Sequence, residues 1–71
     1  MRIKEIKNGS LYYNSNRSRV ERVRSKMNSN SVMTSEPHAD TLLGAKAADL
    51  RMATDSEVSN YKQESEVVHS N

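Results

Sequence analysis

The chain has 71 residues, a formal net charge of +2 and no cysteine. This length allows one small domain at most, and the lack of cysteine excludes disulfides, thiolate metal sites and cysteine nucleophiles. Val, Ile and Leu total twelve and Phe is absent, so the core is small and disorder is expected at the chain ends. From the first residues we expect no signal peptide, and the sequence has no apolar run long enough to span a membrane. We therefore expect a cytoplasmic protein.

Charge is unevenly distributed along the chain. Residues 1–35 carry a net charge of +6, whereas residues 36–71 carry −4. The opposite charges of the two halves can balance each other within one domain, or the basic half can bind nucleic acid or an acidic partner.

Turn-forming residues divide the chain into short segments. Asn8-Gly9 predicts a type I′ hairpin turn, and the Asn-Ser-Asn triplets at 14–16 and 28–30 predict loops. Pro37 predicts a further break. The intervening segments cover residues 2–7, 10–13, 17–27, 31–34 and 41–53. Such spacing is typical of a small antiparallel meander or barrel.

Two of these segments fit a helix as well as a strand. In 17–27 the apolar residues Val20, Val23 and Met27 have helical spacing. As a strand, the same segment would turn Val20 and Val23 to opposite faces, which requires both faces to be partly covered. The segment 41–53 is rich in helix-forming residues but has Gly44 near its middle. Both interpretations stay open.

The strongest local signal is a capping box at Thr54 and Glu57. Asp55 and Glu57 add negative charge to the first turn, where the helix dipole favours it. We therefore predict a short helix that begins near Asp55. We assign residues 1–61 to the domain and residues 62–71, which have no cap or period, to a flexible C-terminal tail.

The run from Leu42 to Val58 resembles the end of a small bacterial SH3-like barrel, in which a last long strand leads into an Asp-Leu-Arg turn and an Ala-Thr-x-x-Glu helix start. The front half is similar in Asn8-Gly9, the segment 11–14 and the segment 19–24. The resemblance covers residues 1–61 and implies a mostly β fold: an antiparallel barrel whose C-terminal helix plugs one open end. It implies no site. The alternative is a small α-helical or partly disordered chain.

If the resemblance holds, the core is formed by apolar residues from every segment. These are Leu11, Tyr13, Val20 or Val23, Val32, Leu43, Ala45, Leu50, Val58 and Tyr61.

The basic run 17–26 is the most suggestive functional feature. On a strand Arg22, Arg24 and Lys26 would share one face, and on a helix Arg19, Arg22 and Lys26 would do so; either stripe can follow phosphates. The competing interpretation is a solvated face that protects a sheet edge. The possible binding surface comprises Tyr12, Arg17, Arg19, Arg22, Arg24 and Lys26.

No catalytic constellation stands out in the sequence. His38 and Asp40 are too few to form a metal site, and the segment 36–40 fits a polar loop. We predict no enzyme, no cofactor and no metal. The predicted function is a non-catalytic binding module with a protein partner. The alternatives are nucleic-acid binding through residues 17–26 and a helical or partly disordered regulatory adaptor.

Overall fold

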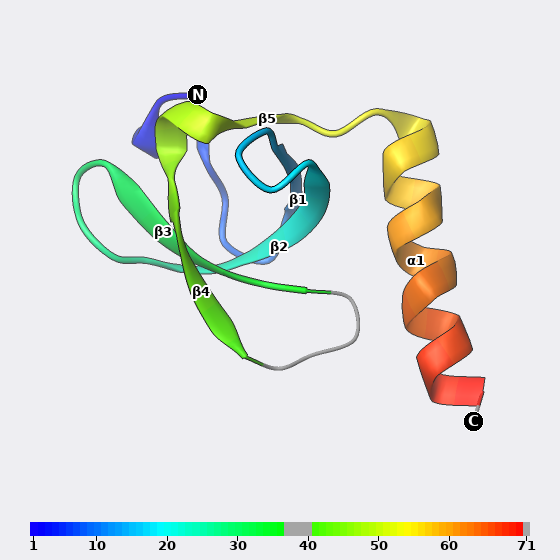
Figure 1. Ribbon diagram of the computed structural model, residues 1–71. Coiled ribbons are helices and arrows are strands. Elements are labelled where there is room, and N and C mark those ends of the chain that lie inside the picture. The colour runs from blue at the N-terminus through cyan, green and yellow to red at the C-terminus, as the bar shows by residue number, and fades with distance from the viewer. Residues whose placement is uncertain (37–40, 71) are drawn as a thin grey trace.

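Figure 1 presents a computed structural model of the protein, which describes residues 1–36 and 41–70. The fold is mostly β, with a five-stranded sheet and one C-terminal helix. The elements in chain order are η1 (Ile3–Glu5), β1 (Leu11–Asn14), β2 (Arg19–Lys26), β3 (Ser31–Ser35), β4 (Leu42–Lys46), η2 (Ala47–Asp49), β5 (Leu50–Met52) and α1 (Asp55–Ser70).

The strands lie in the order β4-β3-β2-β1-β5, and every neighbouring pair is antiparallel. The predicted mostly β fold with a C-terminal helix is therefore confirmed. The predicted closed barrel is not, because β4 and β5 remain the two edges of an open sheet. The mainly helical alternative is wrong.

Both ambiguous segments form strands. Within 17–27, β2 pairs with β1 and β3, and within 41–53, β4 pairs with β3 before η2 leads into β5. Val20 and Val23 do point to opposite faces: Val23 is fully buried in the core, whereas Val20 pairs with Tyr13 and is half-buried. The register shifts between Val23 and Ser25, so a bulge bends β2 where it passes from β1 to β3.

The core lies on one face of the sheet and is small. Its buried hydrophobic residues are Ile6, Tyr12, Val23, Val32, Ala45, Ala47 and Leu50. Val23, Val32, Ala45 and Leu50 were predicted in the core, and Tyr61 is also buried as predicted. The two tyrosines of β1 are reversed relative to the prediction, because Tyr12 faces the core and Tyr13 the opposite side.

Asn8 and Gly9 form a turn, but not the predicted hairpin. Only Gly9 has positive φ, at 86°, whereas a type I′ turn needs positive φ at both central residues. The amide of Ser10 donates to the carbonyl of Lys7 at 3.2 Å, which closes the turn. It joins β1 to the 3-10 turn η1 instead of to a strand.

Helix α1 begins at Asp55, and its capping box is formed as predicted. The amide of Glu57 donates to the Thr54 hydroxyl at 3.2 Å, and the Thr54 amide donates to the Glu57 carboxylate at 2.8 Å. The helix stands beside the sheet, with Tyr61 facing Arg22 of β2, and does not plug one end of it (Figure 1). It extends to Ser70, so residues 62–70 are helical where we expected a tail without regular structure; their flexibility stays a prediction.

Candidate functional site

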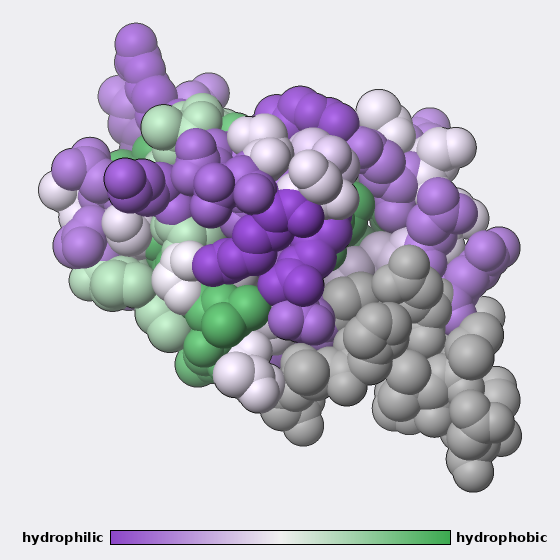
Figure 2. Space-filling model, viewed as in Figure 1, coloured by the Kyte–Doolittle hydropathy of each residue, from purple (hydrophilic) through white to green (hydrophobic). Residues whose placement is uncertain are grey.

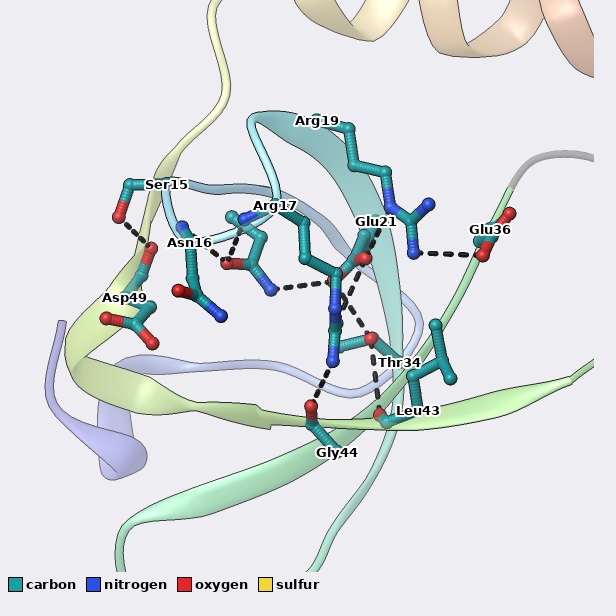
Figure 3. A network of polar contacts seen from close by, with 11 residues as sticks. Ser15, Asn16, Arg17, Arg19, Glu21, Thr34, Glu36, Leu43, Gly44 and Asp49 are labelled. Carbon is teal, nitrogen blue, oxygen red and sulfur yellow. Dashed lines mark hydrogen bonds and ion pairs between the residues drawn. The ribbon is translucent and has the colours of Figure 1, made fainter.

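The basic run does not form a continuous cationic stripe, because its first two arginines are held by a buried carboxylate. Glu21 lies on the core face of β2 with its side chain fully buried. Arg17 donates to both Glu21 carboxylate oxygens, at 2.9 and 3.1 Å, and Arg19 donates from Nε at 2.7 Å. Figure 3 shows both guanidinium groups converging on this carboxylate.

Neutral donors complete the shell around Glu21. The Asn14 side-chain amide donates at 2.9 Å and the Thr34 hydroxyl at 3.0 Å, from β1 and β3 respectively. Burial acts to raise the pKa of Glu21, but the hydrogen bonds from Asn14, Arg19, Thr34 and Arg17 outweigh it, and the net pKa is lowered. Glu21 is therefore an ionised, fully satisfied structural group that solvent does not reach.

The arginines of this network also connect distant parts of the sheet. Arg17 donates to the carbonyl of Gly44 in the edge strand β4, and Arg19 pairs with Glu36 at 2.9 Å (Figure 3). Both side chains thus have structural partners that compete with any external phosphate.

Two more residues of the predicted surface also have internal contacts. Arg22 donates to the Gly9 carbonyl at 2.5 Å and lies over the Tyr61 ring, 5.6 Å from its centroid. Tyr12 is only 3% exposed, and its hydroxyl accepts from the Lys7 amide at 2.9 Å. Tyr12 is therefore buried and is not available to a ligand, and the aromatic ring that lies against the basic run is that of Tyr61, under Arg22.

Arg24 and Lys26 are the exposed members of the predicted surface. They lie on the second half of β2, Arg24 at the register shift and Lys26 beyond it, toward the β2–β3 loop. His38 and Asp40 lie outside the described residues.

A groove of about 830 Å³ opens beside that loop. One wall is the N-terminal segment with η1, and the other is formed by the β2–β3 loop and the junction of β4 with η2. Its lining residues are Met1, Arg2, Ile3, Lys4, Asn28, Ser29, Asn30, Ser31, Lys46, Ala47 and Ala48. Figure 2 shows hydrophilic and weakly apolar side chains mixed over the N-terminal segment and this loop.

Local hydrogen bonds fix the loop against η2. The Asn28 side chain accepts from the Asn30 amide at 2.8 Å, and the Asn30 carbonyl accepts from the Ala47 amide at 2.8 Å. This Asx-type turn is what Asn-Ser-Asn sequences favour. The wall of the groove is thus part of the folded backbone and not a free loop.

The groove has a cationic rim and an apolar floor. Arg2, Lys4 and Lys46 are exposed, and no Asp or Glu belongs to the lining within the described part of the chain. Glu5 lies next to this rim, where its carboxylate accepts from the Arg2 backbone amide at 3.0 Å. Met1 and Ile3 are partly buried against the core and form an apolar base. Such an arrangement attracts an anionic ligand that also offers apolar surface.

Sequence reasoning missed this groove because its cations are separated along the chain. Arg2 and Lys4 belong to η1 and its start, whereas Lys46 ends β4, more than half the chain away. The dense basic run 17–26 predicted a binding surface, but the glutamate in its middle indicated that some of those arginines pair with a carboxylate inside the protein.

Comparison with protein-family models, with curated proteins and with solved structures finds no match for this chain. No helix among residues 1–36 and 41–70 is long and apolar enough to cross a membrane.

Proposed function

We propose that the protein is a non-catalytic protein-binding module whose binding surface is the groove between η1 and the β2–β3 loop. The observation that carries this proposal is the combination of three exposed cations on the rim with an apolar base formed by Met1 and Ile3. A flat charged face binds counterions weakly and without specificity. A concave site with apolar contact area discriminates between ligands by their shape.

The lining favours a protein over a nucleic acid. Single strands are commonly bound by stacking bases on exposed aromatic rings, and the groove is lined by no aromatic side chain within the described residues. Tyr12, the aromatic residue expected to support the basic run, is buried. Nucleic-acid binding remains the alternative, supported by the exposed Arg24 and Lys26 near the same loop.

The SH3-like resemblance is part of the proposal. It is supported by five antiparallel strands in which β5 returns to pair with β1, and by the short turn η2 that precedes β5. In this interpretation the protein acts in the cytoplasm, in keeping with a sequence that lacks cysteine.

Selection of peptides tests the proposal. Short random peptides would be displayed against the immobilised protein, tethered at its C-terminus so that Met1 stays free. Bound peptides would then be titrated into isotopically labelled protein. We expect chemical-shift changes to centre on Arg2, Asn30 and Lys46. Peptides that bind only elsewhere, or a random single-stranded oligonucleotide that perturbs Arg24 and Lys26 while no peptide binds, would overturn it.

A matched pair of variants gives the control. Lys46→Ser removes a cation from the groove, whereas Lys62→Ser removes an exposed cation from α1, outside the lining. The first is expected to weaken peptide binding and the second to leave it unchanged. Equal effects of the two variants would assign the binding to net charge and not to the groove.

A further inference from the structure

We infer that the groove selects an extended acidic segment that places an apolar side chain between carboxylates. This inference rests on the proposed function, because it names the class of protein segment that the same groove would take. It is carried by how charge, apolar surface and backbone groups are arranged around the groove.

The charge of the rim requires an anionic partner. Arg2 and Lys4 line the groove from the N-terminal segment and Lys46 lines it from the end of β4, so two separate parts of the chain bring like charges to it. Their mutual repulsion is relieved when carboxylates lie between them, and water weakens this attraction without removing it. Because the cations come from both walls, a segment with carboxylates on either side of its centre satisfies the rim better than a single anion.

The floor requires an apolar group at that centre. Met1 and Ile3 pack against the hydrophobic core and are half-buried, and Ala47 and Ala48 present only small side chains. A partner side chain such as Leu or Val can cover this base and exclude water from it. A polyanion without apolar side chains would leave this apolar surface exposed to water.

Recognition through side chains is favoured over addition of a strand to β4. The edge strand β4 ends the sheet and would otherwise offer its backbone to an incoming strand. The carbonyl of Gly44, however, already accepts from the Arg17 guanidinium. Arg17 thus occupies an acceptor on this edge, and the partner is selected by its carboxylates and its apolar residue.

Three matched peptides test the inference on the full chain. The first alternates Glu and Leu, the second replaces every Glu with Gln, and the third replaces every Leu with Ser. Each would be titrated at low and at physiological salt while chemical shifts are followed. We expect the Glu-Leu peptide to bind best, to perturb Ile3, Asn30 and Lys46, and to weaken as salt increases.

Charge variants sharpen the test. For each groove cation removed, by Arg2→Ser, Lys4→Ser or Lys46→Ser, we expect about two- to fivefold weaker binding of the Glu-Leu peptide, the range of exposed ion pairs. Lys62→Ser is expected to have no effect.

The possible failures are distinguishable. If the Gln-Leu peptide binds the groove as tightly as the Glu-Leu peptide, the acidic specificity is wrong while the protein-binding function stands. If the Glu-Ser peptide binds equally well, the apolar requirement is wrong. If none of the peptides perturbs the groove and displayed peptides bind elsewhere, both the inference and the proposed function fail.

Discussion

Arg17 and Glu21 form an ion pair in which one guanidinium nitrogen, Nη1, donates to both carboxylate oxygens; the arginine is partly exposed and the carboxylate is fully buried. This asymmetry determines the cost of breaking the pair. An arginine that loses its partner can turn toward water, whereas the buried carboxylate cannot.

Replacing Arg17 with Met is expected to lower the free energy of unfolding by about 2–3 kcal/mol, below the full cost of an unpaired buried charge because other donors remain. Asn14, Arg19 and Thr34 still bind Glu21 in this variant. Urea denaturation measures the change. The control is Arg24→Met on the exposed part of the same strand, for which about 0.5 kcal/mol or less is expected. Equal costs for the two substitutions would show that the network adds nothing.

Acid is expected to destabilise the protein partly through Glu57. Hydrogen bonds from Arg51 and from the Thr54 backbone amide lower the pKa of Glu57 from 4.5 to about 2. Because the folded-state pKa lies below the unfolded one, this contribution is fully present above pH 4.5 and is lost as the pH falls toward 2. The free energy of unfolding, measured against pH, should therefore fall less steeply in this window for Glu57→Gln than for the natural chain. Parallel curves would contradict the assignment.

Removing the cap should loosen the start of α1. Thr54→Ala deletes the hydroxyl that accepts from the Glu57 amide and is expected to cost about 1 kcal/mol in the free energy of unfolding. Ser56→Ala, in the exposed first turn, is the matched control and should have little effect. Combined with Glu57→Ala, which removes the acceptor of the Thr54 amide, Thr54→Ala should cost less than the sum of the two separate changes, since each residue satisfies the other's amide. Strict additivity would contradict a coupled cap.

The two glycines should respond differently to a methyl group. Gly9 has φ of 86° and nothing within 4 Å of an added Cβ, so Gly9→Ala costs backbone strain alone, about 1–2 kcal/mol. At Gly44 an added Cβ would meet only the Met27 Cε, at 3.2 Å, and that flexible side chain can move aside. Gly44→Ala should therefore change the free energy of unfolding by about 0.5 kcal/mol or less. Thermal unfolding of both variants checks the contrast, and equal destabilisation would refute it.

Structural features that depend only on residues close together in the sequence could be predicted from it. The capping box needs only Thr54 and Glu57, and the loop at 28–30 needs only its own Asn side chains, so both could be found from the sequence. The strands in 17–27 and 41–53 could not be distinguished from helices in this way. Their conformation is decided by pairing with β1 and β3, which overrides local propensity.

The candidate site depends on contacts between residues that lie far apart in the sequence. Nothing near Glu21 in the chain indicated that Thr34 of β3 would reach it, so Arg17 and Arg19 looked available for an external ligand. The groove combines Arg2 with Lys46 only after the sheet has formed. Long-range pairing thus removed one candidate surface and created another.

The pairing of β1 with β5 also determines when, during synthesis of the chain, the sheet can be completed. Tyr12 faces Met52 across this pair, so one edge of β1 has no partner until residues 50–52 have been synthesised. Such a distant contact forms slowly, because a long loop must close before any stabilisation is gained. Only two residues, Ala53 and Thr54, separate β5 from α1. We therefore expect the docking of α1 to follow this last pairing, and a nascent chain that stops before Leu50 to expose an unpaired edge of β1.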